Sequence, residues 1–495
     1  MSMISIRNLT FGYGGGPEIF KNLSLDLSDD WRLGLVGRNG RGKTTFLRLL
    51  AGELAHGGTI SMAARPIYFP FGLGQGGGPV GEALLAMFPG LKPWELAREA
   101  DALALAEACL GRPQGELSPG EATKVGLAAL FAMGDVFPLL DEPAGGLDET
   151  GRRLVTSYLA RKRGFVVVSH DRFLLEGAVD HVLSLGRAGP EVHRGSFGSY
   201  WREYEARGQS ELREAKALSR ETKRLGQAAK RAADWAQSTE KGKYGAGPVD
   251  RGYIGHKAAK MAKRAKAVAT RREDALEAKR SFQWTAELNP PVSVSPLTFR
   301  ARRMIEGRGL RLGYGGTGIL EGLDLTLDRG ERLAVKGPNG SGKSLLLSIL
   351  AGGPGNVLAG ELRIPGDLIR SYVPQRIPAM AGTVPGFARA MGADVTMVGA
   401  LLHRMGFGKD DLAARVENLS AGQKRKALLA VSLSSRAHLY VWDEPLDFLD
   451  VFSRSQIEDL ILAGRPGLVF VEHDPAFAGR VATSVLDLGR YGQSD

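Results

Sequence analysis

The hydrophobic positions of this chain form a pattern that occurs twice. Apolar runs at Arg32–Val36 and Arg332–Val335 predict strands, and the stretches that follow predict helices at Thr45–Leu50 and Leu345–Leu350. Each half then has a second apolar run that ends in Asp-Glu and a third at residues 165–168 or 467–471. This alternation predicts an α/β domain with a doubly wound sheet, in which ligands bind at the carboxyl ends of the strands.

Two further segments have a helical pattern. Residues 72–116 begin with a glycine-rich turn and then predict helices at Gly81–Met87 and Pro93–Gly111. Residues Glu211–Thr239 and His256–Arg280 are rich in good helix formers, and glycines between them interrupt any continuous helix. A helical hairpin with its tip at about 241–256 is therefore expected, with arms about 45 Å long.

These patterns divide the chain into three parts. We expect a first α/β domain at 1–200 with a short helical insertion at about 72–116, a helical-hairpin linker at 201–290, and a second α/β domain at 291–495. Each domain is long enough to bury its own core.

Composition indicates the cellular location of the protein. The sequence contains no run of eighteen apolar residues, which is the length needed to span a membrane. The first eleven residues lack the apolar core of a secretory signal. The single cysteine, Cys109, excludes an internal disulfide. We expect a cytoplasmic protein with no membrane part.

The net charge of +11 is concentrated in the linker. Residues 207–280 contain 20 Lys and Arg against 9 Asp and Glu, so the rest of the chain is neutral. A solvated charged coiled coil would explain a bare charge run, but the tip tyrosines Tyr244 and Tyr253 favour contact with RNA. The expected contact residues are Tyr244, Val249, Arg251, Tyr253, Ile254, Lys257, Lys260, Lys263 and Arg264.

Four short motifs occur in the same order in both halves. The first set is GRNGRGKT at 37–44, LSPGE at 117–121, LLDE at 139–142 and SHD at 169–171. The second set is GPNGSGKS at 337–344, LSAGQ at 419–423, VWDE at 441–444 and EHD at 472–474. A single glycine loop carries a real false-positive risk, but four ordered motifs that recur about 300 residues later predict a tandem ATPase.

The residue types indicate the chemistry. Backbone N–H groups of a glycine loop can hold phosphates, and a lysine such as Lys43 or Lys343 reaches the terminal oxygens. Hydroxyl and carboxylate groups suit Mg²⁺, and a glutamate after the aspartate can orient or deprotonate the attacking water. The expected Mg²⁺ residues from this reasoning are Thr44, Asp141, Ser344 and Asp443. The expected catalytic residues are Glu142, Glu444, His170 and His473.

The remaining site residues are expected to bind ATP. Tyr13 and Tyr314 can stack on adenine, although an aromatic near a strand end can also belong to the core. Taken alone, either histidine could be structural and each Asp-Glu pair could cap a helix. The expected ATP-binding residues from this reasoning are Tyr13, Gly37, Asn39, Gly40, Gly42, Lys43, Thr44, Thr45, Tyr314, Gly337, Asn339, Gly340, Gly342, Lys343 and Ser344.

The motif order resembles that of ABC ATPases, over about 390 residues. Two such domains with a basic helical linker resemble the ABC-F subfamily. Four stretches, Leu117–Phe131, Gly164–Arg172, Pro248–Arg264 and Ala437–Val451, are similar to the Lsa-type antibiotic-resistance proteins. The fold that this resemblance implies is two tandem ABC-type nucleotide-binding domains joined by a long α-helical hairpin.

The resemblance also implies a mechanism. A monomer would form an intramolecular sandwich around two ATP molecules, each held by the glycine loop of one domain and the Leu-Ser motif of the other. The motif residues that the resemblance adds to the ATP-binding set are Ser420, Gly422 and Gln423 opposite Lys43, and Ser118, Gly120 and Glu121 opposite Lys343. In the ATP-bound state it would bind the ribosomal E site, contact ribosomal RNA and the P-site tRNA, and protect the peptidyl-transferase centre from lincosamides, streptogramin A or pleuromutilins. ATP hydrolysis would release it. The alternatives are a housekeeping translation factor of the same architecture and, less favoured, the ATPase of an efflux system.

Three departures from the family pattern bear on the sites. Pro119 and Ala421 stand where the Leu-Ser motif has glycine. The segments after the Asp-Glu pairs, at 143–148 and 445–450, differ from the family and from each other. The first half has Phe71 where the second has Gln375, so the two sites are expected to differ in their Mg²⁺ ligands and turnover.

Overall fold

The structure is a computed structural model, which describes residues 2–14, 16, 18–72, 77–186, 189–241 and 293–491, together with 260, 263, 266, 267, 270, 271, 273 and 274. The chain divides into two compact units. One contains Met1–Tyr200 with Pro291–Asp495, and the other contains Trp201–Pro290.

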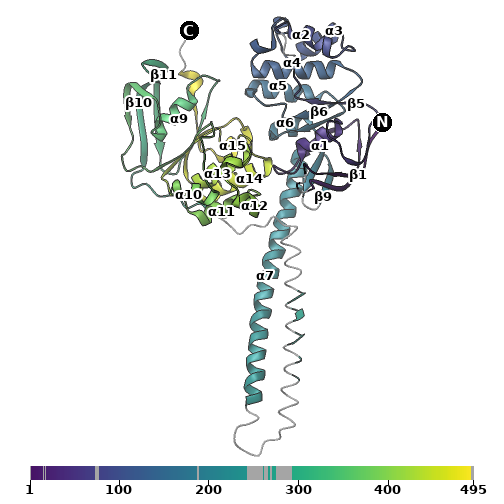
Figure 1. Ribbon diagram of the computed structural model, residues 1–495. Coiled ribbons are helices and arrows are strands. Elements are labelled where there is room, and N and C mark those ends of the chain that lie inside the picture. The colour runs from purple at the N-terminus through teal and green to yellow at the C-terminus, as the bar shows by residue number, and fades with distance from the viewer. Residues whose placement is uncertain are drawn as a thin grey trace, which may run out of the picture. The chain divides into compact units, whose positions relative to one another are not determined.

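The first α/β domain alternates strands and helices (Figure 1). Its strands are β1 (Met3–Phe11), β2 (Phe20–Ser28), β3 (Arg32–Val36), β4 (Gly57–Ser61), β5 (Arg65–Phe69), β6 (Val136–Asp141), β7 (Phe165–Val168), β8 (His181–Gly186) and β9 (Gly189–Arg194). Its α-helices are α1 (Lys43–Leu50), α2 (Val80–Met87), α3 (Pro93–Ala102), α4 (Pro119–Ala132), α5 (Glu149–Ala160) and α6 (Arg172–Ala178), and its 3₁₀ turns are η1 (Glu107–Cys109) and η2 (Gln114–Glu116).

The second α/β domain repeats this order. Its strands are β10 (Arg303–Tyr314), β11 (Thr317–Asp328), β12 (Arg332–Lys336), β13 (Asn356–Arg363), β14 (Arg370–Val373), β15 (Leu439–Asp443), β16 (Gly467–Val471) and β17 (Ser484–Asp487). Its α-helices are α9 (Lys343–Ala351), α10 (Val384–Ala390), α11 (Val395–Arg404), α12 (Lys409–Ala413), α13 (Ala421–Ser434), α14 (Val451–Gly464) and α15 (Pro475–Val481), with 3₁₀ turns η4 (Val416–Asn418) and η5 (Leu488–Arg490).

The main sheets place the motifs side by side. Their strand orders are β5-β6-β7-β3-β8-β9 and β14-β15-β16-β12-β17, and all neighbours pair in parallel except β8 with β9. The order changes direction at β3 and β12, the strands that precede the glycine loops. The carboxyl end of β7 or β16 therefore lies next to each loop, and that of β6 or β15 lies one strand further along the sheet, as expected for a doubly wound fold.

A second, antiparallel layer covers each main sheet. The strands β2-β1-β4 and β11-β10-β13 form these smaller sheets. In the first domain, α1 lies between the two layers, because its Phe46 and Leu47 pack in one core with Ile6 of β1 and Leu35 of β3. The second domain has the corresponding core around α9. The glycine loops are thus anchored at both ends by buried apolar elements.

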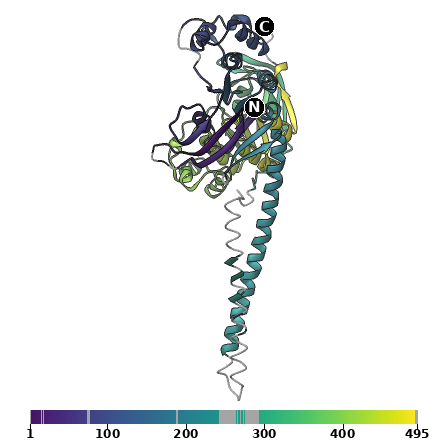
Figure 2. The same cartoon turned by 90° about the vertical axis from the view of Figure 1, so that its right-hand side faces the viewer.

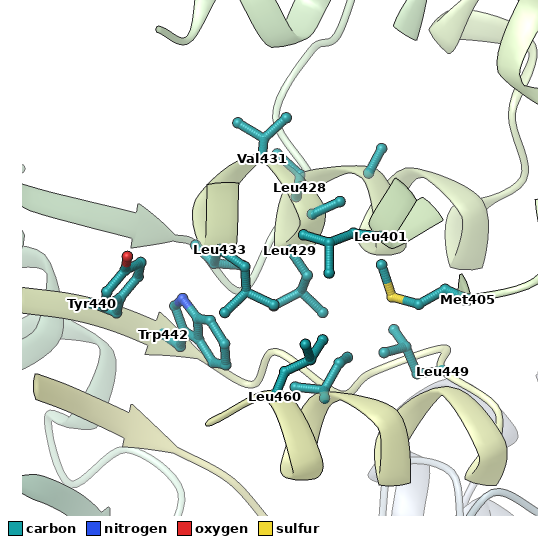
Figure 3. Close-up of a cluster of buried hydrophobic side chains, with 14 of the residues drawn as sticks. Leu401, Met405, Leu428, Leu429, Val431, Leu433, Tyr440, Trp442, Leu449 and Leu460 are labelled. Carbon is teal, nitrogen blue, oxygen red and sulfur yellow. The ribbon is translucent and has the colours of Figure 1, made fainter. Parts of the chain in front are cut away.

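The other face of the second main sheet is covered by helices. Figure 3 shows Leu401 and Met405 of α11 beside Leu429 of α13, with Trp442 of β15 and Leu460 of α14 completing the cluster. Trp442 is fully buried and its indole N–H donates to Ser432 Oγ over 3.0 Å. This core ties the helical subdomain to the strand that carries Asp443.

The helical insertion of the first domain differs in one point from the prediction. The helix expected at Pro93–Gly111 ends at Ala102, and Ala104 has a left-handed φ of 48°. Leu103 and Leu105 are buried on either side of this residue. The turn brings both leucines into the core, which a continuous helix would not do, since adjacent helical positions point in different directions.

The other unit contains most of one long helix, α7 (Phe197–Lys241) (Figure 2). The helix begins fourteen residues before Glu211, the predicted start, because Tyr200 and Trp201 belong to the same continuous helix. Lys260 and Lys263 are helical and exposed. Tyr244, Val249, Arg251, Tyr253, Ile254, Lys257 and Arg264 lie outside the described residues. Within the part of the chain that the structure describes, no helix has the length and apolar character needed to cross a membrane.

Candidate ATP-binding sites

Each glycine loop joins a buried strand to a helix. Gly42 and Gly342 cap α1 and α9 with φ of 83° and 84°, a conformation that favours glycine. A Cβ at Gly42 would lie 2.5 Å from Ile19 Cγ2, and one at Gly342 would lie 2.8 Å from Leu320 Cγ. The glycines are therefore required by both backbone geometry and space, and each loop ends at a helix N-terminus, where an anion can bind.

The two loop lysines fold back over their own loops. Lys43 Nζ donates to Gly37 O over 2.8 Å, and Lys343 Nζ donates to Gly337 O over 2.9 Å. Burial lowers the pKa of both lysines. A phosphate beside either ammonium group would replace lost hydration and favour the charged form.

The glutamates predicted to be catalytic have the same unusual backbone geometry in both domains. Glu142 and Glu444 follow the last residue of β6 and β15 with left-handed φ of 52° and 46°. Such conformations cost about 1–3 kcal/mol and occur most often at functional sites. The carboxylates lie next to the predicted histidines, with Glu142 Oε1 3.3 Å from His170 Nε2 and Glu444 Oε1 3.4 Å from His473 Nε2.

The electrostatics of the two glutamates differ. Desolvation raises the pKa of Glu142 to about 7. Desolvation also raises the pKa of Glu444, but hydrogen bonds with His473 and Gln375 outweigh it and lower that pKa to about 2. Asp447 contacts Glu444 and has a raised pKa because it is desolvated beside that carboxylate. The position that matches Asp447 in the first domain is Gly145, so the first site lacks this third acid.

The predicted Mg²⁺ residues fit a hard cation better in the second domain. Asp443 Oδ1 is buried and, among the described residues, has no hydrogen-bond partner, while Ser344 bonds with the same carboxylate. Gln375 lines the same cavity as Ser344 and Glu444. A cation there would satisfy the unpaired oxygen.

The first domain has aromatic groups at the corresponding place. Tyr68 O–H donates to Asp141 Oδ2 over 2.9 Å. Phe71 packs edge-on against Phe69 and Phe88, with ring centroids 5.9 and 5.4 Å away. The missing glutamine is thus replaced by apolar packing, which explains the departure at this position.

The two tyrosines proposed to bind adenine are exposed. Tyr13 is 50% and Tyr314 is 48% exposed, so neither belongs to the core. Tyr13 Oη lies 3.2 Å from Thr45 Oγ1, at the start of α1. Tyr314 lines a cavity with Lys343 and Ser344. Both rings are therefore accessible near a glycine loop, as stacking on a base would need.

The Leu-Ser motifs begin helices α4 and α13. Ser118 and Ser420 are N-caps, and each forms a capping box with Glu121 or Gln423. These two longer side chains therefore serve their own helix ends in this structure. Pro119 occupies the first helical position, which tolerates proline, although it offers no N–H to a phosphate.

The first ATP site, built on Lys43, is in contact with the second domain. Asn39 N–H donates to Asp450 Oδ2 over 3.2 Å, and Asn39 Nδ2 donates to Phe448 O over 2.7 Å. A Cβ at Gly422 would lie 2.9 Å from Asn39 Nδ2, so the Leu-Ser-Ala-Gly motif meets the opposing glycine loop. The pairing of Lys43 with the second motif, expected from the resemblance, agrees with this geometry.

The second ATP site, built on Lys343, surrounds a cavity of about 580 Å³. The second domain contributes Tyr314, Ser344, Gln375, Glu444 and His473. The first domain contributes Gly146, Leu147 and Arg152, from the 143–148 loop and the start of α5. Ser118, Gly120 and Glu121 are not among these lining residues, and Gly120 instead packs on the 143–148 loop of its own domain.

The sequence did not identify the residues of the second domain that Asn39 contacts. It did not identify Arg152 either. Arg152 and Arg454 occupy matching positions four residues after the aspartate that caps α5 or α14. That repetition was the available signal. It could not show which domain each arginine would contact.

Comparisons with known proteins agree with this geometry. The family model described as ABC transporter matches residues 20–145 and 320–447. The ATP-binding protein Uup of Caulobacter vibrioides is 29% identical, over 99% of this chain and 78% of its own. The tylosin resistance ATP-binding protein TlrC of Streptomyces fradiae is 28% identical, over 98% and 97%. The ribosome protection protein VmlR of Bacillus subtilis is 24% identical, over 96% and 84%.

A solved structure shares the fold. The crystal structure of archaeal ribosomal stalk protein aP1 with archaeal ribosome recycling factor aABCE1 matches with a TM-score of 0.60 and 21% identity. The match covers 94% of this chain and 85% of the other. At this identity the likeness concerns the fold alone.

Proposed function

This chain belongs to the ABC transporter family, as an ATPase of the ABC-F branch, and from that premise we propose that it protects ribosomes from antibiotics. The observation that carries the proposal is the full-length likeness to VmlR, which spans both ATPase domains and the basic segment between them. In its ATP-bound state the protein would bind the ribosomal E site, next to the P-site tRNA.

The two ATP molecules would be held by the glycine loops. Lys43 and Lys343 would leave the loop carbonyls and bind the terminal phosphates. Burial lowers the pKa of both lysines, so their present environment disfavours the ammonium form, and a phosphate beside it would stabilise that form. Tyr13 and Tyr314 would stack on adenine. Mg²⁺, when bound by Thr44 and Asp141 or by Ser344, Gln375 and Asp443, would supply charge neutralisation at the phosphates.

Hydrolysis would depend on the two glutamates. Each would accept a proton from the attacking water. Each has a left-handed backbone conformation, and its carboxylate lies beside the histidine of the same domain, His170 or His473. Glu444 is ionised at neutral pH and contacts Gln375 and His473. The second site therefore has the more complete catalytic set, and the first site, with Phe71, is expected to hydrolyse ATP more slowly.

The linker would supply contact with ribosomal RNA. Its excess of eleven positive charges suits a phosphate-lined cavity. Its proposed tip, at about 241–256, would approach the peptidyl-transferase centre, where Tyr253 and Arg251 would stack on bases or displace a drug.

A double variant tests the proposal. Glu142→Gln with Glu444→Gln removes both proposed bases and keeps both phosphate-binding loops. Hydrolysis should fall by about 10²–10⁴-fold while ATP binding persists. The variant should then co-sediment with ribosomes in ATP and dissociate in ADP. Absence of ATP-dependent co-sedimentation would contradict ribosome binding.

A translation factor without drug protection is the second candidate. It is favoured by the likeness to the energy-dependent translational throttle protein EttA of Escherichia coli, which is 24% identical over 95% of this chain and 89% of its own. Growth of a sensitive host with and without the protein, across lincosamides, streptogramin A and pleuromutilins, separates the two. Ribosome binding without any gain in resistance would favour the second candidate.

A further inference from the structure

His473 of the second ATP site is held by side chains on both of its backbone polar groups. Its N–H donates to Glu472 Oε2 over 3.0 Å, and its carbonyl accepts from Arg152 Nη1 over 3.3 Å. Glu472 belongs to the same domain, whereas Arg152 belongs to the other. Because the imidazole lies 3.4 Å from Glu444, the position of this backbone decides how that pair is arranged.

Each of these two side chains also binds a loop that follows an Asp-Glu pair. Arg152 Nε donates to Leu147 O over 3.1 Å, in the 143–148 loop. Glu472 Oε1 accepts from Leu446 N–H over 2.7 Å, in the 445–450 loop. The backbone of His473 is therefore linked to the loops of both domains through one side chain on each side.

The first ATP site is arranged differently. Arg454, which matches Arg152, also donates from Nε to the preceding loop, at Leu449 O, but its Nη1 donates to Asp474 of its own domain. Ser169 stands where the second domain has Glu472, and its hydroxyl accepts from Asp171 N–H. The two halves thus share the arginine but differ in the partner of its Nη1 and in the residue before the histidine, Glu472 or Ser169.

We propose that Arg152 is a positioning residue that acts across the domain interface, holding His473 against Glu444 only when the two ATPase domains are closed. The planar guanidinium suits this role because one end can donate to Leu147 while the other donates to His473. Opening of the interface would break the second bond and leave the first intact. This inference rests on the proposed roles of Glu444 and His473 in hydrolysis.

The test isolates each site before Arg152 is changed. Glu142→Gln leaves the second site as the active one, and Glu444→Gln leaves the first. Arg152→Met keeps the length of the side chain and removes its donors. In the Glu142→Gln background it should lower kcat by about 10-fold or more, the usual effect of losing a charged hydrogen bond. The KM for ATP should change less than threefold, because Lys343 and the glycine loop remain.

Controls separate positioning from a general loss of packing. Arg153→Met removes the neighbouring arginine, whose exposed side chain pairs with Glu149, and should leave kcat unchanged. Arg152→Lys keeps the charge but cannot donate to both carbonyls, so it should restore only part of the rate. A loss of kcat by Arg152→Met that is equal in both backgrounds, or no loss in the Glu142→Gln background, would overturn the proposal.

A second readout does not depend on hydrolysis. In the Glu142→Gln/Glu444→Gln protein with ATP, the imidazole NMR signal of His473 can be assigned by His473→Asn. Arg152→Met should shift that signal, and the signal of His170 should stay in place. An unchanged His473 signal would overturn the proposal, whereas continued hydrolysis by the double glutamine protein would contradict only the proposed function.

Discussion

Glu142 and Glu444 occupy equivalent positions in two similar domains and yet have different proton affinities. Desolvation dominates at Glu142, whereas His473 and Gln375 stabilise the charged form of Glu444. Phe71 replaces the glutamine in the first domain and Gly145 replaces Asp447. The side chains around a general base, and not the base itself, therefore distinguish the two sites.

This difference predicts separate pH profiles. With a pKa raised to about 7, Glu142 is protonated below that pH and cannot accept a proton, so the rate of the Glu444→Gln protein should rise as the pH increases through about 7. Glu444 has a lowered pKa and stays ionised, so the rate of the Glu142→Gln protein should be nearly flat between about pH 6 and pH 8. Steady-state ATPase assays measure both profiles. Parallel profiles would contradict the assignment.

The helical subdomains are attached to the two sheets by different interactions. In the first domain, Glu99 of α3 is buried and accepts from Tyr158 Oη over 2.7 Å and from Lys162 Nζ. The second domain has Leu401 and Leu460 at the positions of Glu99 and Tyr158, in the cluster of Figure 3. A charged network in one domain thus replaces apolar packing in the other.

Breaking this network should destabilise the first domain. Glu99→Leu leaves the Lys162 ammonium without its buried partner, and loss of one member of a buried ion pair costs about 3–5 kcal/mol. The triple variant Glu99→Leu, Tyr158→Phe and Lys162→Met removes the acid with its tyrosine and lysine partners and keeps most of the volume, while the third partner, Arg98, is exposed and stays hydrated. It should recover to within about 1–2 kcal/mol of the parent. Denaturant unfolding measures both, and a triple variant no more stable than Glu99→Leu would refute this account.

The whole molecule combines two nearly neutral ATPase domains with a linker whose residues 207–280 carry a net charge of +11. The two domains also meet through a buried charge pair, since Arg172 of α6 pairs with the fully buried Glu458 of α14 over 2.9 Å. Losing Glu458 would leave the Arg172 guanidinium without its acid at the interface, whereas losing Arg172 would leave Glu458 with Arg480 of its own domain. Closure is therefore specified by particular side chains, while the linker charge is proposed to serve a partner outside the chain.

Neutralising the linker should weaken that external binding. Changing Lys257, Lys260, Lys263 and Arg264 to glutamine should lower ribosome affinity and reduce its dependence on salt, by about 0.7–0.9 in the log–log slope for each phosphate that is no longer neutralised. ATPase activity without ribosomes should remain. Glutamine at Lys21 and Lys92, two exposed bases of the first domain, provides the control. An unchanged dependence of ribosome affinity on salt would show that these four basic residues are only solvated.

The amino-acid sequence by itself determined the tandem ABC fold and the strand–loop–helix order around Lys43 and Lys343. These features are local: an apolar strand, glycines with left-handed φ and a following helix lie within about twenty residues. The same holds for Glu142 and Glu444 at strand ends. The predicted extent of α3 was wrong, because the chain turns at Ala104 so that two leucines reach the core. This packing lies outside the local pattern.

Tertiary structure alone decided how the two halves meet. That Asn39 binds the 445–450 loop and Arg152 binds His473 depends on packing between segments more than 300 residues apart, which no local pattern encodes. The pKa values of Glu142 and Glu444 likewise depend on side chains drawn from several elements. Phe71 could be recognised from the sequence as a departure, but only the packing against Phe69 and Phe88 explains why an aromatic ring stands there.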